Sequence, residues 1–153
     1  MEKFICIDMQ SFSTPDFTPK EMTIITATGE KHHYQFKNEV PLWTIPIKLV
    51  RTIRWLERNY HGIKYGPLGS SFTPTIFNEF QHAVVYVKGA EKQKFLQKYF
   101  STVINLEYQT ECPKFVKTQA YCPHHEENGE ETAWICSYIN CKLLFNYVLY
   151  LYS

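Results

Sequence analysis

The sequence lacks a strong excess of charge of either sign, a long uninterrupted apolar run and any repeated or low-complexity tract. Its 16 Lys and Arg residues against 15 Asp and Glu give a formal net charge of +1. No global field therefore draws the protein to DNA or to an anionic membrane, and any nucleic-acid surface must be local. The most apolar stretch spans residues 134–152. Three polar residues interrupt it, Asn140, Lys142 and Asn146, so we expect no membrane span.

We also expect no secretory signal, because the apolar run after Met1-Glu2-Lys3 stops at Asp8. We therefore expect an intracellular location, cytoplasmic or nuclear, where thiols stay reduced. The sequence has five cysteines. In a reducing compartment, clustered cysteines indicate a metal site more often than disulfides.

The signatures of several enzyme classes are absent. There is no phosphate-binding glycine-rich loop, no HExxH motif, and no Ser, His and Asp in the sequence order of a catalytic triad. A composition of 44% hydrophobic and 20% charged residues excludes a disordered chain. The 153 residues fit one domain over positions 1–153. Aromatic residues make up 16% of the chain and supply large side chains for a core, an interface or base stacking.

Hydrophobic periodicity and turn residues predict an α/β protein. The strands are expected at residues 4–7, 21–27, 33–36, 83–87 and 103–106. The helices are expected at 47–60, 76–80, 89–100 and 132–149. Gly62 follows the first long helix and is a typical stop signal. We therefore predict a mixed five-stranded sheet flanked by helices.

Two segments resemble the first two motifs of the DEDD (DnaQ-like) exonucleases. Residues 4–10, Phe-Ile-Cys-Ile-Asp-Met-Gln, resemble a strand followed by Asp-x-Glu. Residues 84–96 resemble a strand followed by His-Asn-x-x-Phe-Asp-x-x-Phe-Leu. The order of elements, with an acidic residue at the end of the first strand, is also that of these enzymes. The resemblance spans nearly the whole chain and implies a ribonuclease H-like fold.

Three further segments, at 59–63, 87–89 and 122–125 with Cys136, resemble uncharacterised insect and mobile-element proteins. Those proteins are similar to the nuclease-like domain of Maelstrom, a piRNA-pathway protein. In that domain the exonuclease carboxylates are absent, and a metal-ligating Glu-Cys-His-Cys set is present. The resemblance implies a mobile-element, viral or RNA-silencing context.

The departures from the exonuclease pattern bear on catalysis, because two-metal cleavage needs several convergent carboxylates. Asp8 is present, but Gln10 stands at the second carboxylate position. A neutral amide is a weaker Mg²⁺ ligand than a carboxylate. The alignment of the second motif puts Lys92 at an Asp position. We expect its ammonium to neutralise Asp8 in place of a cation.

The third motif, His-x-x-x-x-Asp, has no good counterpart, since the final helix offers Ser137, Asn140 and Cys141 but no Asp. These departures predict a noncatalytic domain. An active Mg²⁺- or Mn²⁺-dependent 3′–5′ exonuclease stays open as an alternative. It would use Asp8, Glu91 and Glu107 from a shifted alignment. Asp8 alone is also a common turn residue at a strand end.

A Cys/His-rich loop at 107–141 gives the most specific chemical signal. Its candidate donors are Cys112, Cys122, His124, His125, Cys136 and Cys141. Cys-x-x-His at 122 and 125 is a common chelating pair, and mixed thiolate and imidazole donors suit Zn²⁺. The predicted structural zinc ligands are Cys112, Cys122, His125 and Cys136, and Glu107 or Cys141 could replace one of them. The alternative makes Cys136 and Cys141 small core residues of the last helix.

The helix at 47–60 carries a basic stripe opposite its apolar residues. The stripe contains Lys48, Arg51, Arg54 and Arg58, and a phosphate backbone could lie along it. An ordinary solvated helix face gives the same pattern. His61, just after this helix, could line the cleft or serve in capping and packing.

Together these features predict a noncatalytic exonuclease-like domain that binds nucleic acid, preferably single-stranded RNA. Two alternatives remain at this stage. One is the active metal-dependent exonuclease. The other is an adaptor that binds a protein partner, or a second copy of itself, through the aromatic C-terminal helix.

Overall fold

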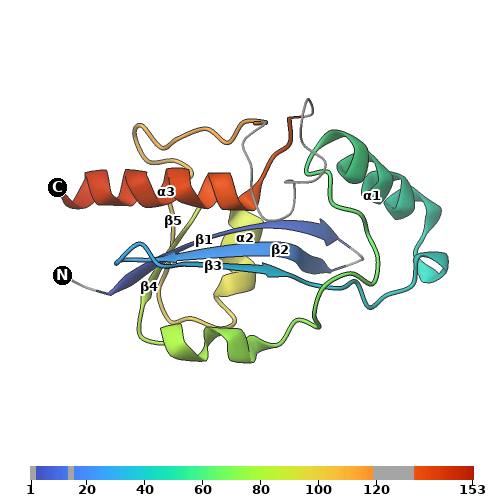
Figure 1. Cartoon of the computed structure of the whole chain (residues 1–153), viewed down its shortest axis with the longest axis horizontal. Coiled ribbons are helices and arrows are strands. Elements are labelled where there is room, and N and C mark those ends of the chain that lie inside the picture. Colours follow the sequence, from blue (N-terminus) through green and yellow to red (C-terminus); the bar gives the residue numbers. More distant parts are fainter. Residues whose placement is uncertain (1–2, 14–15, 119–132) are drawn as a thin grey trace.

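The chain forms a mixed five-stranded sheet in the order β3-β2-β1-β4-β5 (Figure 1). The computed structural model describes residues 3–13, 16–118 and 133–153. The strands are β1 (Phe4–Ser13), β2 (Phe17–Thr26), β3 (Lys31–Gln35), β4 (Val84–Val87) and β5 (Val103–Asn105). β1, β2 and β3 pair with one another antiparallel, and β4 and β5 run parallel to β1.

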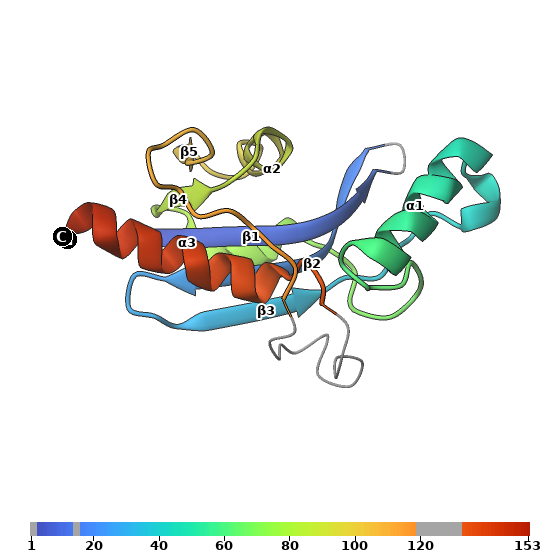
Figure 2. The ribbon, with the colours of Figure 1, turned by 90° about the horizontal axis from the view of Figure 1, so that it is seen from above.

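Helices cover both faces of this sheet and one of its ends. They are α1 (Ile47–Asn59), α2 (Ala90–Leu96), α3 (Ser137–Tyr152) and the 3₁₀ helices Leu42–Thr44 and Pro74–Phe80. α3 lies across β1 and β2 on one face, and α1 lies beyond the end to which β1 points (Figures 1 and 2). The predicted α/β architecture with a mixed five-stranded sheet is confirmed.

β1 is buried on both faces of the sheet. Its successive residues point to opposite faces, and each face is covered by a different cluster. Ile5 and Ile7 join a cluster with the second 3₁₀ helix and α2. Phe4 and Cys6 point to the other face and pack under α3. Asp8 continues this second set, so an acidic side chain lies in the layer between the sheet and α3.

α1 is attached to the sheet through the far end of β1. Phe12 of β1 is fully buried and forms a third cluster with Ile45 and Ile53. These contacts use the apolar side of α1 and leave its basic side in solvent. The strands and helices therefore bring α1, the end of β1 and the start of α2 to one side of the molecule.

The predicted boundaries of four elements, β1, β2, α2 and α3, were wrong. β1 does not stop near Asp8 but runs to Ser13, and β2 begins at Phe17 instead of at residue 21. The two strands pair along most of this length, with a register shift between Gln10 and Ser11. α2 ends at Leu96, after which single turns continue to residue 100. α3 runs from Ser137 to Tyr152, later at both ends than predicted.

Within the described ranges, no helix is both long enough and apolar enough to cross a membrane. α3 is the most apolar helix, with 16 residues. Lys142 and two asparagines lie within it.

Candidate functional site

Asp8 is fully buried, and side chains from two helices contact its carboxylate. Lys92 of α2 donates to Oδ1 at 2.6 Å, and Asn140 of α3 donates from Nδ2 to Oδ2 at 3.0 Å. Burial raises the pKa of Asp8, while the Lys92 ammonium and the Asn140 amide act to lower it. The expected contact between Lys92 and Asp8 is therefore present. Both carboxylate oxygens thus accept hydrogen bonds from protein side chains.

The turn before α2 delivers Lys92 to this position. Gly89 has a φ of 121°, a conformation that favours glycine, and it connects β4 directly to α2. Asn105 Oδ1 accepts the backbone N–H groups of Gly89 and Glu107, each at 3.0 Å. Asn105 thus joins the turn after β4 to the turn after β5. Lys92, which follows the first turn, and Glu107, in the second, line the same cavity.

A second buried carboxylate, Glu21 of β2, contacts the first turn of α3. Glu21 accepts the Ser137 backbone N–H at 3.1 Å and the Ser137 hydroxyl at 2.6 Å, and its other oxygen lies 3.2 Å from His33 Nε2. Glu21 also pairs with Gln10 across the β1–β2 ladder. Glu21 was not predicted from the sequence. Its only sequence signal is an acidic residue at the start of a strand rich in Ile and Thr.

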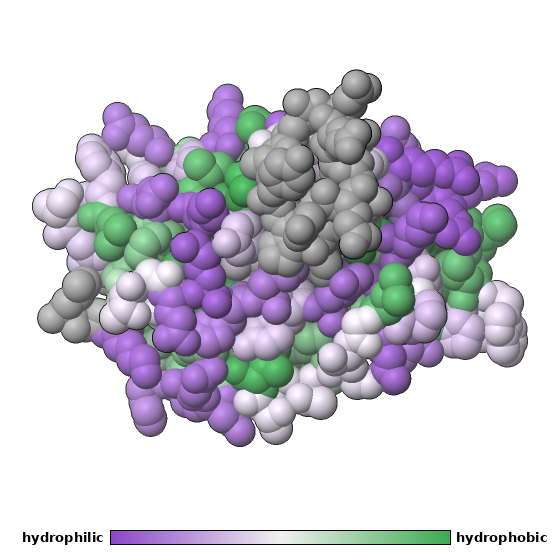
Figure 3. Space-filling view, in the orientation of Figure 1, coloured by the Kyte–Doolittle hydropathy of each residue, from purple (hydrophilic) through white to green (hydrophobic). Residues whose placement is uncertain are grey.

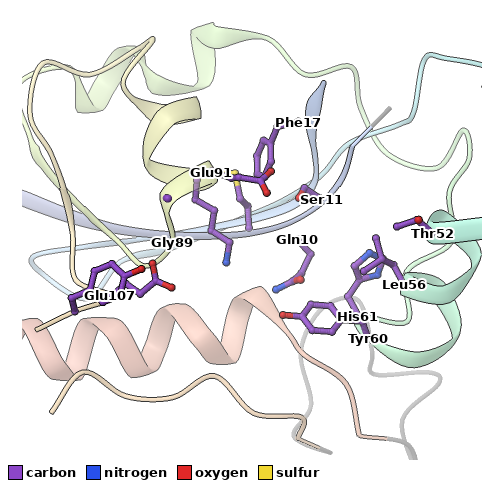
Figure 4. Close-up of a pocket in the computed structure, with 14 residues that line it drawn as sticks. Gln10, Ser11, Phe17, Thr52, Leu56, Tyr60, His61, Gly89, Glu91 and Glu107 are labelled. Atoms are coloured by element: carbon purple, nitrogen blue, oxygen red, sulfur yellow. The ribbon is translucent and has the colours of Figure 1, made fainter. Parts of the chain in front are cut away.

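A cavity of about 500 Å³ opens beside the Asp8–Lys92 pair. Its walls come from β1, α1, the start of α2 and the segment after β5. In Figure 4 the Gln10 amide and the Tyr60 hydroxyl point into the same space, with Glu107 on another side. Gln10 is only 4% exposed, and its Nε2 has no hydrogen-bond partner in the described structure. The cavity therefore contains a buried polar group available to a ligand.

The carboxylates of the shifted alignment do not form a cation site with Asp8. Glu91 and Glu107 line the cavity, whereas Asp8 is not part of its lining. Among the described residues, no group of three His, Cys, Asp or Glu side chains could hold a metal ion.

The predicted zinc ligands are only partly within the described residues, since Cys122 and His125, like the candidate donor His124, lie outside them. Cys112 is half-buried, and burial raises the pKa of its thiol, with Lys88 lowering it and Glu107 raising it. Cys136 is buried directly before α3. Zinc therefore stays a prediction that depends on Cys122 and His125.

Cys141 packs in the core instead. Its buried thiol lies 3.1 Å from the Cys6 carbonyl oxygen and 3.4 Å from that of Thr23. Burial raises the pKa of this thiol well above its ordinary value. The contacts favour a packing role for Cys141 over the role of a substitute zinc ligand.

The basic residues of α1 are exposed, as the stripe predicts: Lys48, Arg51, Arg54 and Arg58. Arg54 is paired with Glu57, at 2.8 Å and 3.2 Å to its two oxygens. His61 differs from the other predicted nucleic-acid contacts because it is fully buried. Its Nδ1 accepts the Ile63 N–H at 3.0 Å, and its ring packs edge-on against Phe12 at 5.0 Å. These contacts favour a packing role for His61 at the cavity wall.

Comparison of the chain with protein-family models, with curated proteins and with solved structures gives no match.

Proposed function

We propose that this protein is a noncatalytic, nucleic-acid-binding domain of the ribonuclease H-like, DnaQ-exonuclease-like type. The observation that carries the proposal is the saturated carboxylate of Asp8. The Lys92 ammonium donates to one oxygen of Asp8 at 2.6 Å, and the Asn140 amide donates to the other at 3.0 Å. A two-metal reaction needs several carboxylates converging on the cations, and Gln10 and Lys92 replace two of them. The active-exonuclease alternative is accordingly the weaker one.

The nucleic-acid part of the proposal rests on α1 and the adjoining cavity. Lys48, Arg51 and Arg58 are exposed cations on one helix of a protein whose net charge is only +1, while Arg54 is paired with Glu57, so any positive potential is local to this helix. Thr52, Leu56 and Tyr60 form the α1 side of the cavity wall. A strand that follows the basic side of α1 would thus pass the mouth of the cavity. The preferred ligand is single-stranded RNA, and the Maelstrom resemblance supports a mobile-element, viral or RNA-silencing context.

Labelled single-stranded RNA and DNA test this proposal when incubated with the protein in Mg²⁺, Mn²⁺ or EDTA. We expect a mobility shift that persists in EDTA, and no metal-dependent shortening of the label, because Lys92 takes the place of the cation. The matched variant is Asp8→Ala. Cleavage that needs Mg²⁺ or Mn²⁺ and disappears in Asp8→Ala would contradict the noncatalytic assignment. Absence of any shift would contradict nucleic-acid binding.

One observation favours a second candidate, an adaptor that uses α3. The last turn of α3 exposes large apolar side chains: Leu149, Tyr150, Leu151 and Tyr152. Exposed apolar clusters of this kind mark interaction surfaces. Sedimentation velocity of the protein and of Leu149→Glu/Leu151→Glu distinguishes this candidate, since a dimer held by α3 would dissociate in the double variant.

A further inference from the structure

The basic side of α1 also exposes an aromatic ring. Trp55 is 54% exposed, which is unusual for a tryptophan in a helix that packs on a core. Arg51 precedes it by four residues and Arg58 follows it by three, so all three side chains are neighbours on the helix surface. Lys48 lies one further turn back along the same side. Cationic residues therefore flank the tryptophan along the exposed side of the helix.

The Tyr60 ring packs against the Trp55 ring. Their rings stack with centroids 6.3 Å apart and an interplanar angle of 29°. Tyr60 also lines the cavity beside Gln10. The indole is thus held against a second ring on its inner side, and its exposed part faces solvent among the arginines. A ring held in this way loses little conformational freedom when a ligand stacks on it.

This combination fits one ligand chemistry better than others. An acidic peptide would pair with the guanidinium groups but would leave the tryptophan uncovered. A duplex would present phosphates to the arginines, but its bases are stacked on one another and cannot reach the indole. A single strand offers both groups at once, because phosphates alternate with unpaired bases whose faces stack on aromatic rings. From Lys48 to Arg58 the helix rises by about 15 Å, enough for several nucleotides.

We propose that Trp55 is a base-stacking residue and that α1 selects single-stranded over double-stranded nucleic acid. Arg51 and Arg58 contact the phosphates on either side of the stacked base. This inference rests on the proposed function, and it adds the residue that distinguishes a single strand from a duplex.

Oligonucleotides of about 12 nucleotides, single-stranded and as the matched duplex, provide the test. Trp55→Leu should weaken single-strand binding about tenfold and leave the salt dependence unchanged, because it removes stacking but no charge. Trp55→Phe should retain most of the affinity while losing most of the quenching of tryptophan fluorescence. Arg51→Ala/Arg58→Ala should lower the slope of log K against log salt by about 1.4. Trp43→Leu is the matched control, since Trp43 is 86% exposed but precedes α1.

The outcomes separate this inference from the proposed function. If the unaltered protein binds single strands and Trp55→Leu binds them equally well, the stacking role is overturned and the proposed function stands. Equal affinity for the duplex, or an equal loss in Trp43→Leu, would also overturn it. A dimer that dissociates in Trp55→Leu, with unchanged oligonucleotide affinity, would identify a second copy of the chain as the occupant. Failure of the unaltered protein to bind any oligonucleotide would overturn both proposals.

Discussion

At the scale of single residues, buried charges decide what the site can do. Asp8 is fully buried, and the Lys92 side chain is 20% exposed, so this ion pair is shielded from water on most sides. A buried ion pair adds little net stability over an apolar pair, but removal of one partner leaves an uncompensated charge. Lys92 therefore matters for the buried charge that it neutralises.

Lys92→Ala is predicted to lower the free energy of unfolding by about 3 kcal/mol, because the Asp8 carboxylate then loses its counterion. Urea denaturation at neutral pH measures this change. Lys94→Ala is the control, since Lys94 lies exposed on the same helix. Equal effects of the two substitutions would show that the Asp8 contact does not support the fold.

Lys20 is a second buried cation, and it predicts a pH dependence. It donates to the Gly66 and Leu68 carbonyl oxygens, each at 3.2 Å, and burial lowers its pKa from 10.5 to about 8. Between these two values the unfolded chain holds a proton that the folded protein has released, so the Lys20 contribution to stability rises with pH. We expect the free energy of unfolding of the unaltered protein, relative to Lys20→Met, to increase by about 2 kcal/mol from pH 8 to pH 10.5.

Urea denaturation of both proteins at the two pH values gives this difference. Comparison with Lys20→Met removes the contributions of tyrosines and cysteines that titrate in the same range. A difference that stays constant with pH would mean that Lys20 keeps an ordinary pKa in the folded protein.

At the scale of elements, the start of α3 depends on a strand that is distant in the sequence. The helix has no side-chain cap of its own at Cys136, and Glu21 of β2 accepts the first backbone N–H and hydroxyl instead. A carboxylate at a helix N-terminus is also favoured by the helix dipole. β2 thereby fixes the position of α3, and α3 in turn brings Asn140 to Asp8.

Glu21→Ala is predicted to destabilise the protein by about 2 kcal/mol, since the Ser137 donors lose a charged acceptor in a buried place. In Glu21→Ala, amide hydrogen exchange should accelerate relative to the unaltered protein, and the increase should be larger in the first turn of α3 than in β1. Glu30→Ala, an exposed acidic residue after β2, serves as the control. Unchanged protection of the first turn of α3 would argue against this capping role.

The elements that the sequence predicted well are those defined by local patterns. The helix from Ile47 has apolar residues at helical spacing, and its predicted range differs from the observed one by a single residue. The length of β1 was not predictable in this way. Asp8 has the appearance of a strand end, yet the strand continues because Lys92 and Asn140, 84 and 132 positions away, neutralise and cover it. The Lys92 contact itself was foreseen only through the exonuclease motif, and Glu21 has no local signature.

At the scale of the whole molecule, the described sheet has two apolar layers, and only the second includes residues of the Cys/His-rich loop, since Cys141 belongs to it and Cys112 and Phe115 pack against it. The first contains Phe77 and Phe95, and the second contains Leu144 and Val148. Most residues of both layers come from the strands and helices. A metal site at Cys112 and Cys136 would add to the stability of these layers instead of replacing it.

The zinc prediction is therefore that the purified protein carries about one zinc ion per chain, held by Cys112, Cys122, His125 and Cys136. Its removal should lower the melting temperature but leave the far-ultraviolet spectrum of a folded protein, because the apolar layers persist without the metal. Elemental analysis and thermal denaturation before and after chelation measure both effects. Cys122→Ser should lose the metal, whereas Cys6→Ala, a core cysteine under α3, should retain it. Protein purified without chelators and free of zinc would refute the site, and full unfolding on chelation would show that the sheet depends on the metal after all.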